Sequence, residues 1–275
     1  MPNPPAPALL SWPRVWNGQK ASTRARMIPE ETAVAFTYQR ATYAVMMATP
    51  SDLDDFAVGF SLNEGIINAA SEIETLEIAV LPAGVELRMD LTSPQAEQLW
   101  VRRRAMRGAT GCGLCGVESL QAALPTPPPV TRAISIPAPA LLQAMAALGA
   151  EQTLNRQTHG VHAAAFWSPA QGLAYVREDV GRHNALDKLA GALARNGVAA
   201  ASGAVLLTSR VSVELVQKTA MMGASVIAAI SVPTALAVRV AEAAGITLVG
   251  IARSDGFEIF THPERILMKD PVNAA

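Results

Sequence analysis

Short apolar segments alternate with helical segments through the last third of this 275-residue chain. A chain that alternates in this way buries its strands in a mostly parallel sheet with helices on both faces. We therefore predict an α/β domain with three layers over residues 140–275. Its alternating part is predicted as helix 184–194, strand 204–208, helix 212–222, strand 225–230, helix 233–244 and strand 246–251.

The first half of the chain predicts a smaller α+β subdomain, rich in β-structure, over residues 24–108. Two hairpins are expected there, at 33–48 and 73–90, with a helix from residue 53 between them. Five prolines within the first 13 residues predict disorder over 1–23. The cysteine pair and the proline run Pro125–Pro129 place a loop and a stiff linker at 109–139.

One uncharged stretch has the length of a membrane span, from Thr219 to Val238. Gly223, Ser231 and Pro233 divide it into a strand and the start of a helix, so we interpret it as buried core and expect no membrane partner. The net charge of −1 gives no reason to expect a nucleic-acid partner. Two cysteines cannot brace a secreted fold of this size, and the N-terminus lacks a signal-peptide pattern, so a reduced cytoplasmic location is expected.

The only two cysteines of the chain lie three residues apart, in the glycine-flanked sequence Gly111–Gly116. Glycines allow a partner to approach closely, and the helix predicted after Cys115 would lower the pKa of a thiol at its N-terminus. Four arginines just upstream, at 102–104 and 107, would favour the thiolate of Cys112 and attract an anion. Two other interpretations of the cysteine pair are open. A structural zinc site would need histidines to complete its four ligands, and the two thiols could instead be buried and unreactive.

Polar groups are also predicted to gather where the parallel strands end, the usual ligand position in such sheets. A helix cap accounts for Asp179 or Gly181 but not for the charged residues that follow them, among which His183 is the candidate proton carrier or polar anchor. Arg210, beside a helix start, suits a phosphate, although an ordinary cap by Ser212 explains that turn equally well.

Several of these segments, in chain order, resemble the formate dehydrogenase accessory sulfurtransferase family, FdhD. The likeness runs from about Glu30 to His262. It is carried by Thr49-Pro50, Gly59–Ile67, Gly111–Gly116, Glu178–Lys188, Ser209–Lys218 and Leu248–Arg253.

The resemblance implies a sulfurtransferase that serves formate dehydrogenase. A cysteine desulfurase would load sulfane sulfur onto Cys112 as a persulfide, Cys115 would assist or resolve it, and the sulfur would pass to the bis-guanylyl molybdenum cofactor. It further implies a cytidine-deaminase-like fold, a homodimer and no resident metal, with a guanine nucleotide able to mimic the cofactor. The residues expected to bind that cofactor are His183 and Arg210, from the sheet-edge argument, and Ile251, Ala252, Arg253, Ser254, Asp255 and Gly256, from the family's nucleotide loop.

Two other functions are weighed against this one. A zinc-dependent nucleoside or base deaminase would need an H-x-E motif before P-C-x-x-C, whereas His262-Pro263-Glu264 follows a cysteine pair preceded by glycine. A chaperone that only shields the cofactor would not need the Cys112 thiol.

Overall fold

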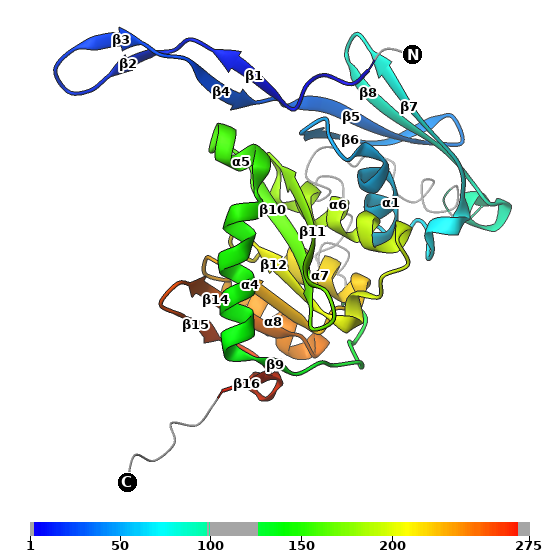
Figure 1. Cartoon of the computed structure of the whole chain (residues 1–275). Coiled ribbons are helices and arrows are strands. Elements are labelled where there is room, and N and C mark those ends of the chain that lie inside the picture. Colours follow the sequence, from blue (N-terminus) through cyan, green and yellow to red (C-terminus); the bar gives the residue numbers. More distant parts are fainter. Residues whose placement is uncertain (1–2, 98, 100–125, 269–275) are drawn as a thin grey trace.

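The computed structural model describes residues 3–97, 99 and 126–268. It divides into a larger three-layer α/β part and a smaller β-rich part that lies beside it (Figure 1).

A six-stranded sheet forms the middle layer of the larger part. Its three central strands are parallel to one another, and the strands outside them are antiparallel to their neighbours. The prediction of a mostly parallel sheet is thus correct for the alternating segment and wrong for the sheet as a whole, because a short hairpin adds antiparallel strands at each side. Across the sheet the strands are β11 (Gly172–Asp179), β10 (His162–Ser168), β12 (Ala204–Leu207), β13 (Val226–Ala229), β14 (Thr247–Arg253) and β15 (Gly256–Ile259).

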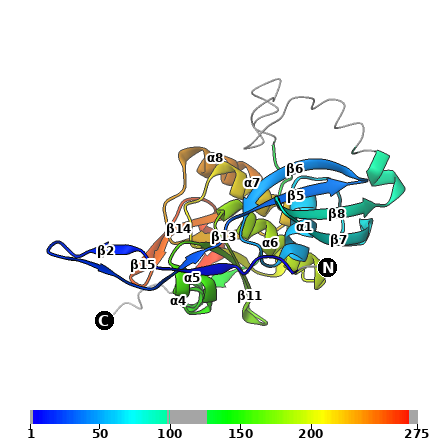
Figure 2. The ribbon, with the colours of Figure 1, turned by 90° about the horizontal axis from the view of Figure 1, so that it is seen from above.

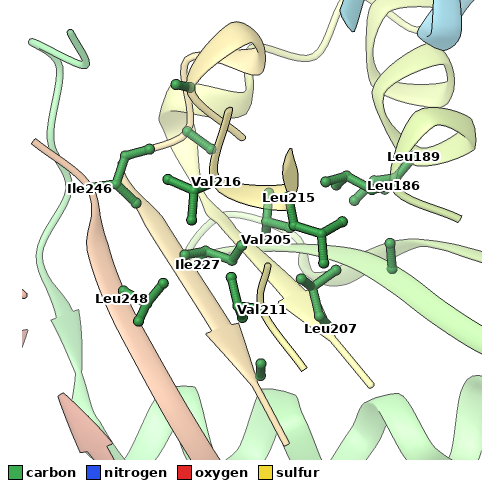
Figure 3. Close-up of a cluster of buried hydrophobic side chains, with 14 of the residues drawn as sticks. Leu186, Leu189, Val205, Leu207, Val211, Leu215, Val216, Ile227, Ile246 and Leu248 are labelled. Carbon is green, nitrogen blue, oxygen red and sulfur yellow. The ribbon is translucent and has the colours of Figure 1, made fainter. Parts of the chain in front are cut away.

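Helices cover both faces of this sheet because its central strands are apolar on both sides. On one face lie α6 (Arg182–Arg195), α7 (Val213–Met222) and α8 (Ala235–Ala244), whose apolar side chains pack on β12–β14 in the cluster of Figure 3. The other face is covered by α4 (Ala138–Glu151). The uncharged segment 219–238 is buried core here, as predicted, and no helix in the described part of the chain is long and apolar enough to cross a membrane.

The smaller part is a four-stranded sheet with a helix packed on its inner face. Both predicted hairpins and the helix between them are confirmed. The strand order is β6 (Ala41–Ala48), β5 (Thr32–Tyr38), β8 (Gly84–Leu91) and β7 (Ile73–Leu81), and the helix is α1 (Leu53–Asn63). Phe36, Phe56 and Phe60 stack at the centre of its core.

The two parts meet where α1 crosses α6, and the crossing is unusually close. A Cβ atom on Gly59 would lie 1.7 Å from the carbonyl oxygen of Asp187, and one on Gly191 would lie 1.8 Å from that of Asp55. Only glycine leaves room for two helix backbones at this distance. The crossing therefore fixes the position of the N-terminal part against α6.

Residues 1–23 were predicted to be disordered, and this is wrong for the segments that form strands. The strands β1 (Ala8–Ser11) and β4 (Arg26–Pro29) pair, as do β2 (Arg14–Trp16) and β3 (Ala21–Thr23). The prolines lie outside β1, β2 and β3, so they do not prevent pairing. The resulting two-stranded arm projects from the body in both views (Figures 1 and 2).

The remaining described elements are short. They include a helical segment over residues 93–97, the helix α5 (Thr153–Thr158), the strands β9 (Ile136–Pro137) and β16 (Ile266–Leu267), and the 3-10 turns η1 (Ala70–Glu72), η2 (Ala200–Ser202) and η3 (Pro263–Arg265).

Candidate functional site

The loops that follow β12, β13 and β14 lie side by side at one edge of the large sheet. The amide of Thr234 donates to the carbonyl oxygen of Val211 at 2.9 Å, and the amide of Ile251 donates to that of Ser231 at 3.2 Å. The strand β11 ends at this same edge, because it is antiparallel to β10 and β10 is antiparallel to β12. The helices α6, α7 and α8 begin here, so free amide groups face this edge. We call it the carboxyl edge.

His183 occupies the α6 end of this edge and contacts the start of α7. Its Nε2 atom lies 3.3 Å from the hydroxyl oxygen of Ser212 and 3.8 Å from a carboxylate oxygen of Glu214. Burial, followed by the positive charges of Arg182 and Lys218, lowers the pKa of His183 to about 4. At neutral pH this side chain is therefore an uncharged hydrogen-bonding group and not a cation.

The carboxylate of Glu214 stays ionised beside this imidazole. Burial alone would raise its pKa, but the hydrogen bond from Ser212, its own backbone amide and the positive charge of Arg182 together lower it. Ser212 is also the N-cap residue of α7, although its side chain makes no capping hydrogen bond. Its hydroxyl group joins His183 to Glu214 instead.

Asp187 lies one turn further along α6 and is held by two partners. The ammonium group of Lys218 is 2.6 Å from both carboxylate oxygens, and the Nδ2 atom of Asn63 donates to one of them at 2.7 Å. Asn63 is the last residue of α1 and lies 124 positions away in the sequence, so this contact links both parts of the protein. The charge of Asp187 is compensated within the fold.

Asp179 and Lys188 form a completely buried ion pair at 2.7 Å. Lys188 also donates to the carbonyl oxygen of Thr49 at 2.8 Å, and Asp179 accepts from the amides of Thr49 and Gly181 and from the side chain of Asn184. The carboxylate of Asp179 thus accepts four hydrogen bonds from protein groups, and the ammonium of Lys188 donates two. We assign this pair to holding residues 47–49 against α6, and not to binding a ligand.

The loop 251–256 closes the other end of the carboxyl edge, between β14 and β15. The side chains of Arg253, Ser254 and Asp255 are exposed, whereas Ala252 is buried in the core and cannot offer its side chain to a ligand. The Nε atom of Arg253 lies 3.3 Å from the carbonyl oxygen of Ile230, so the guanidinium reaches across to the loop after β13.

The structure therefore places the sequence candidates unevenly. Arg210, His183 and the loop 251–256 share one edge, with His183 at the β11 end of the row and Arg253 at the β14 end. Cys112, Cys115 and the upstream arginines 102–104 and 107 lie outside the described residues. Sequence reasoning missed the contacts of Asn63 and Thr49, because neither residue carries a chemical signal apart from its distant partner.

The three layers define an α/β protein, and in open sheets of this class ligands commonly bind at the carboxyl ends of the strands. Residues 29–267 match the model of the FdhD/NarQ family, and the chain belongs to that family. It is 52% identical over 248 residues to the sulfur carrier protein FdhD of Agrobacterium fabrum, which covers 90% of this chain and 92% of that relative.

Two further comparisons agree. The sulfur carrier protein FdhD of Cupriavidus necator is 49% identical over 240 residues, 87% of this chain and 83% of the relative. The crystal structure of a protein described as a formate dehydrogenase accessory protein, from Desulfotalea psychrophila, superposes with a TM-score of 0.76 at 25% identity, covering 95% of this chain and 100% of that one.

Proposed function

We propose that this protein is a sulfur carrier that matures formate dehydrogenase in the cytoplasm. The observation that carries the proposal is its similarity, at about half of all positions and over most of its length, to proteins named as sulfur carriers. Its only two cysteines, set in one glycine-flanked loop, supply the nucleophile that such a function needs.

In the proposed reaction the thiolate of Cys112 attacks the terminal sulfur of a persulfide on a cysteine desulfurase. An S–S bond forms at Cys112 while the S–S bond on the desulfurase breaks, and the desulfurase cysteine leaves as a thiolate. The outer sulfur of the Cys112 persulfide would then be taken up by the bis-guanylyl molybdenum cofactor, which is the acceptor substrate. The S–S bond of the persulfide breaks, the reduced metal of that substrate supplies the two electrons that bring the sulfur to the sulfide level, and Cys112 leaves as a thiolate. In the alternative route the thiolate of Cys115 attacks the inner sulfur of the Cys112 persulfide, which releases the outer sulfur as sulfide and leaves a Cys112–Cys115 disulfide for a cellular thiol to reduce.

The carboxyl edge supports a role in holding that acceptor. Exposed Arg210 and Arg253 and the first amides of α7 and α8 are suited to the phosphates of a dinucleotide. The uncharged imidazole of His183 adds a hydrogen-bonding group that does not repel these cations. The guanine nucleotide is assigned to the loop 251–256, through its backbone and the side chains of Arg253, Ser254 and Asp255.

Mass spectrometry of the cysteine peptide tests the carrier step. After incubation with a desulfurase and cysteine, the wild-type peptide and the Cys115→Ala peptide should gain about 32 Da, the mass of one sulfur atom. In Cys112→Ala the remaining thiol, that of Cys115, should gain no sulfur atom that is consumed during turnover. An adduct that forms only on Cys115, or on neither cysteine, would contradict the mechanism.

A cofactor chaperone is the alternative that this experiment alone does not separate. The two functions are distinguished by measuring formate dehydrogenase activity in cells that carry Cys112→Ala. A chaperone with this change would still yield active enzyme, whereas a sulfur carrier would not. Binding of GDP to the purified variant serves as the control, because the carboxyl edge is unchanged and nucleotide affinity should be retained.

A further inference from the structure

The two ring nitrogens of His183 have different surroundings. Nε2 lies against the start of α7, 3.3 Å from the hydroxyl oxygen of Ser212 and 3.8 Å from a carboxylate oxygen of Glu214. Nδ1 forms no hydrogen bond with any residue that the structure describes, and it is not enclosed by them, since the side chain is 31% exposed. One nitrogen therefore serves the fold, and the other is open at the carboxyl edge.

The position of the proton on the neutral imidazole follows from Ser212. A serine hydroxyl has a single hydrogen to donate. That hydrogen goes to Glu214, because an ionised carboxylate can only accept. The oxygen of Ser212 can then only accept from His183, so Nε2 carries the proton. Nδ1 is left with a lone pair and no hydrogen, which makes it an acceptor.

The surroundings of the ring keep it in this neutral form. Burial, followed by the charges of Arg182 and Lys218, lowers the pKa of His183. The charges of Glu214 and Asp187 act to raise that pKa, but they do not outweigh the first group. Because Lys218 and Asp187 are paired at 2.6 Å, both of their charges stay at fixed positions beside α6. At neutral pH the protein therefore presents a bare Nδ1 atom.

We propose that His183 is a specificity-determining residue of the carboxyl edge, where Nδ1 accepts a hydrogen bond from an uncharged N–H or O–H group of the acceptor substrate. The inference rests on the proposed function, which places that substrate along this edge. A bare ring nitrogen repels the oxygen atoms of a phosphate, so His183 does not bind the diphosphate. A site that accepts from a substrate N–H or O–H group discriminates against analogues that lack it.

The position of His183 along the edge narrows the source of the donor. His183 contacts the start of α7, which follows β12, whereas the loop 251–256 follows β14, and β13 lies between these strands. Neighbouring strands are about 4.8 Å apart, so roughly 10 Å separates the two positions. A guanine base held by the loop therefore does not itself reach His183. The donor is then a ribose hydroxyl group or an N–H group of the pterin beyond the diphosphate.

NMR of the full-length protein, labelled with nitrogen-15 in its histidines, tests the position of the proton. Long-range proton–nitrogen spectra at neutral pH distinguish a protonated ring nitrogen from a bare one, and His183→Gln identifies the signals of His183 by their loss. We expect the proton of His183 on Nε2 and none on Nδ1. A proton on Nδ1, or a doubly protonated ring, would overturn the proposal.

Titration of the same sample with small probes identifies the donor. GDP has ribose hydroxyl groups, 2′,3′-dideoxy-GDP lacks them, and tetrahydrobiopterin supplies the N–H groups of a reduced pterin. A shift of the Nδ1 signal with GDP but not with its dideoxy analogue assigns the donor to the ribose. A shift that appears only when the pterin is added to the GDP complex assigns it to the pterin. No response to any probe, an equal response to both nucleotides, or a response to inorganic phosphate alone would overturn the proposal.

His183→Asn and His183→Gln form a matched pair of variants. The shorter Asn amide occupies the place of Nδ1 and keeps an acceptor there, whereas the Gln amide occupies the place of Nε2 and keeps only the contact with Ser212. For the probe that moves the Nδ1 signal, calorimetry should show an affinity about tenfold lower in His183→Gln, the loss of one hydrogen bond, and within about threefold of the wild type in His183→Asn. Equal losses in the two variants, or none, would contradict the role of Nδ1.

His262→Asn is the control for the substitution itself. His262 lies at the other end of β14, where its carbonyl oxygen accepts from the hydroxyl group of Thr247 at 2.9 Å, and its φ of 46° is one that Asn adopts readily. Its affinity for the probe should equal that of the wild type, and circular dichroism checks that every variant is folded. Bound nucleotide with an unresponsive His183 overturns this inference alone. A wild type that binds none of the probes overturns the nucleotide site of the proposed function together with it, while the carrier step at Cys112 keeps its own test.

Discussion

Replacing Gly59 by alanine should force α1 away from α6. The added Cβ atom would lie 1.7 Å from the carbonyl oxygen of Asp187 and 2.6 Å from the amide nitrogen of Gly191, whereas ordinary contacts are 3.4–4 Å. Both obstacles are backbone atoms, so no side-chain rotation relieves the clash. The helices would have to separate by about 2 Å, and overpacking of this kind costs up to about 3 kcal/mol.

Alanine has a higher helix propensity than glycine, which works against this loss by about 1 kcal/mol. We therefore expect Gly59→Ala to lower the free energy of unfolding by about 2 kcal/mol or more. Chemical denaturation followed by circular dichroism measures this value. Shifting α6 would also disturb the hydrogen bond from Asn63 to Asp187, so nucleotide binding at the carboxyl edge should weaken as well.

Gly149→Ala is the matched control. Gly149 also lies within a helix, α4, but a Cβ atom there would meet nothing within 4 Å. This change should raise the free energy of unfolding by about 0.5–1 kcal/mol, through helix propensity alone. Two substitutions of the same kind are thus expected to have opposite signs. A Gly59→Ala protein as stable as Gly149→Ala would refute the close crossing of the two helices.

Three further predictions concern the charged groups. Lys188→Met should lower the free energy of unfolding by about 3 kcal/mol, because it leaves the buried carboxylate of Asp179 without its cation; equilibrium denaturation that shows no loss would contradict a buried pair. The pKa of His183 falls from 6.5 to about 4 on folding, so between these values the unfolded chain binds more protons and stability should fall as the pH drops from 6.5 towards 4. His183→Gln should flatten that pH dependence, and an unchanged slope in denaturation curves at several pH values would speak against it. Arg253→Ala should weaken GDP binding measured by calorimetry about tenfold, with Arg239→Ala, on the exposed face of α8, unchanged; equal affinities would remove Arg253 from the nucleotide site.

Much of the fold could be predicted because its signals are local. The strands β12, β13 and β14 are short apolar runs, and the helices between them have caps and apolar stripes that can be identified in the sequence. The direction of the outer strands could not be predicted, since it depends on which hairpins join the sheet. The arm was missed because its prolines masked the strand-forming residues between them.

The candidate site could be predicted only in part. Parallel strands end at one edge, so Arg210 and the loop 251–256 were expected near each other, and the structure places them on that edge. The roles of Asp187 and Lys188 could not be inferred, because their partners Asn63 and Thr49 lie more than a hundred residues away. A charged side chain that suggests function in the sequence can instead form a buried ion pair that stabilises the fold.

The thiol of Cys112 is the group on which the proposed sulfur transfer depends. A single-turnover experiment tests it most directly: protein carrying a ³⁵S-labelled persulfide, free of desulfurase, is mixed with the molybdenum cofactor and apo-formate dehydrogenase. The account predicts that label leaves the Cys112 peptide and appears in the cofactor as activity rises, and that Cys112→Ala supports neither change. Enzyme that becomes active while the label stays on the protein would contradict it.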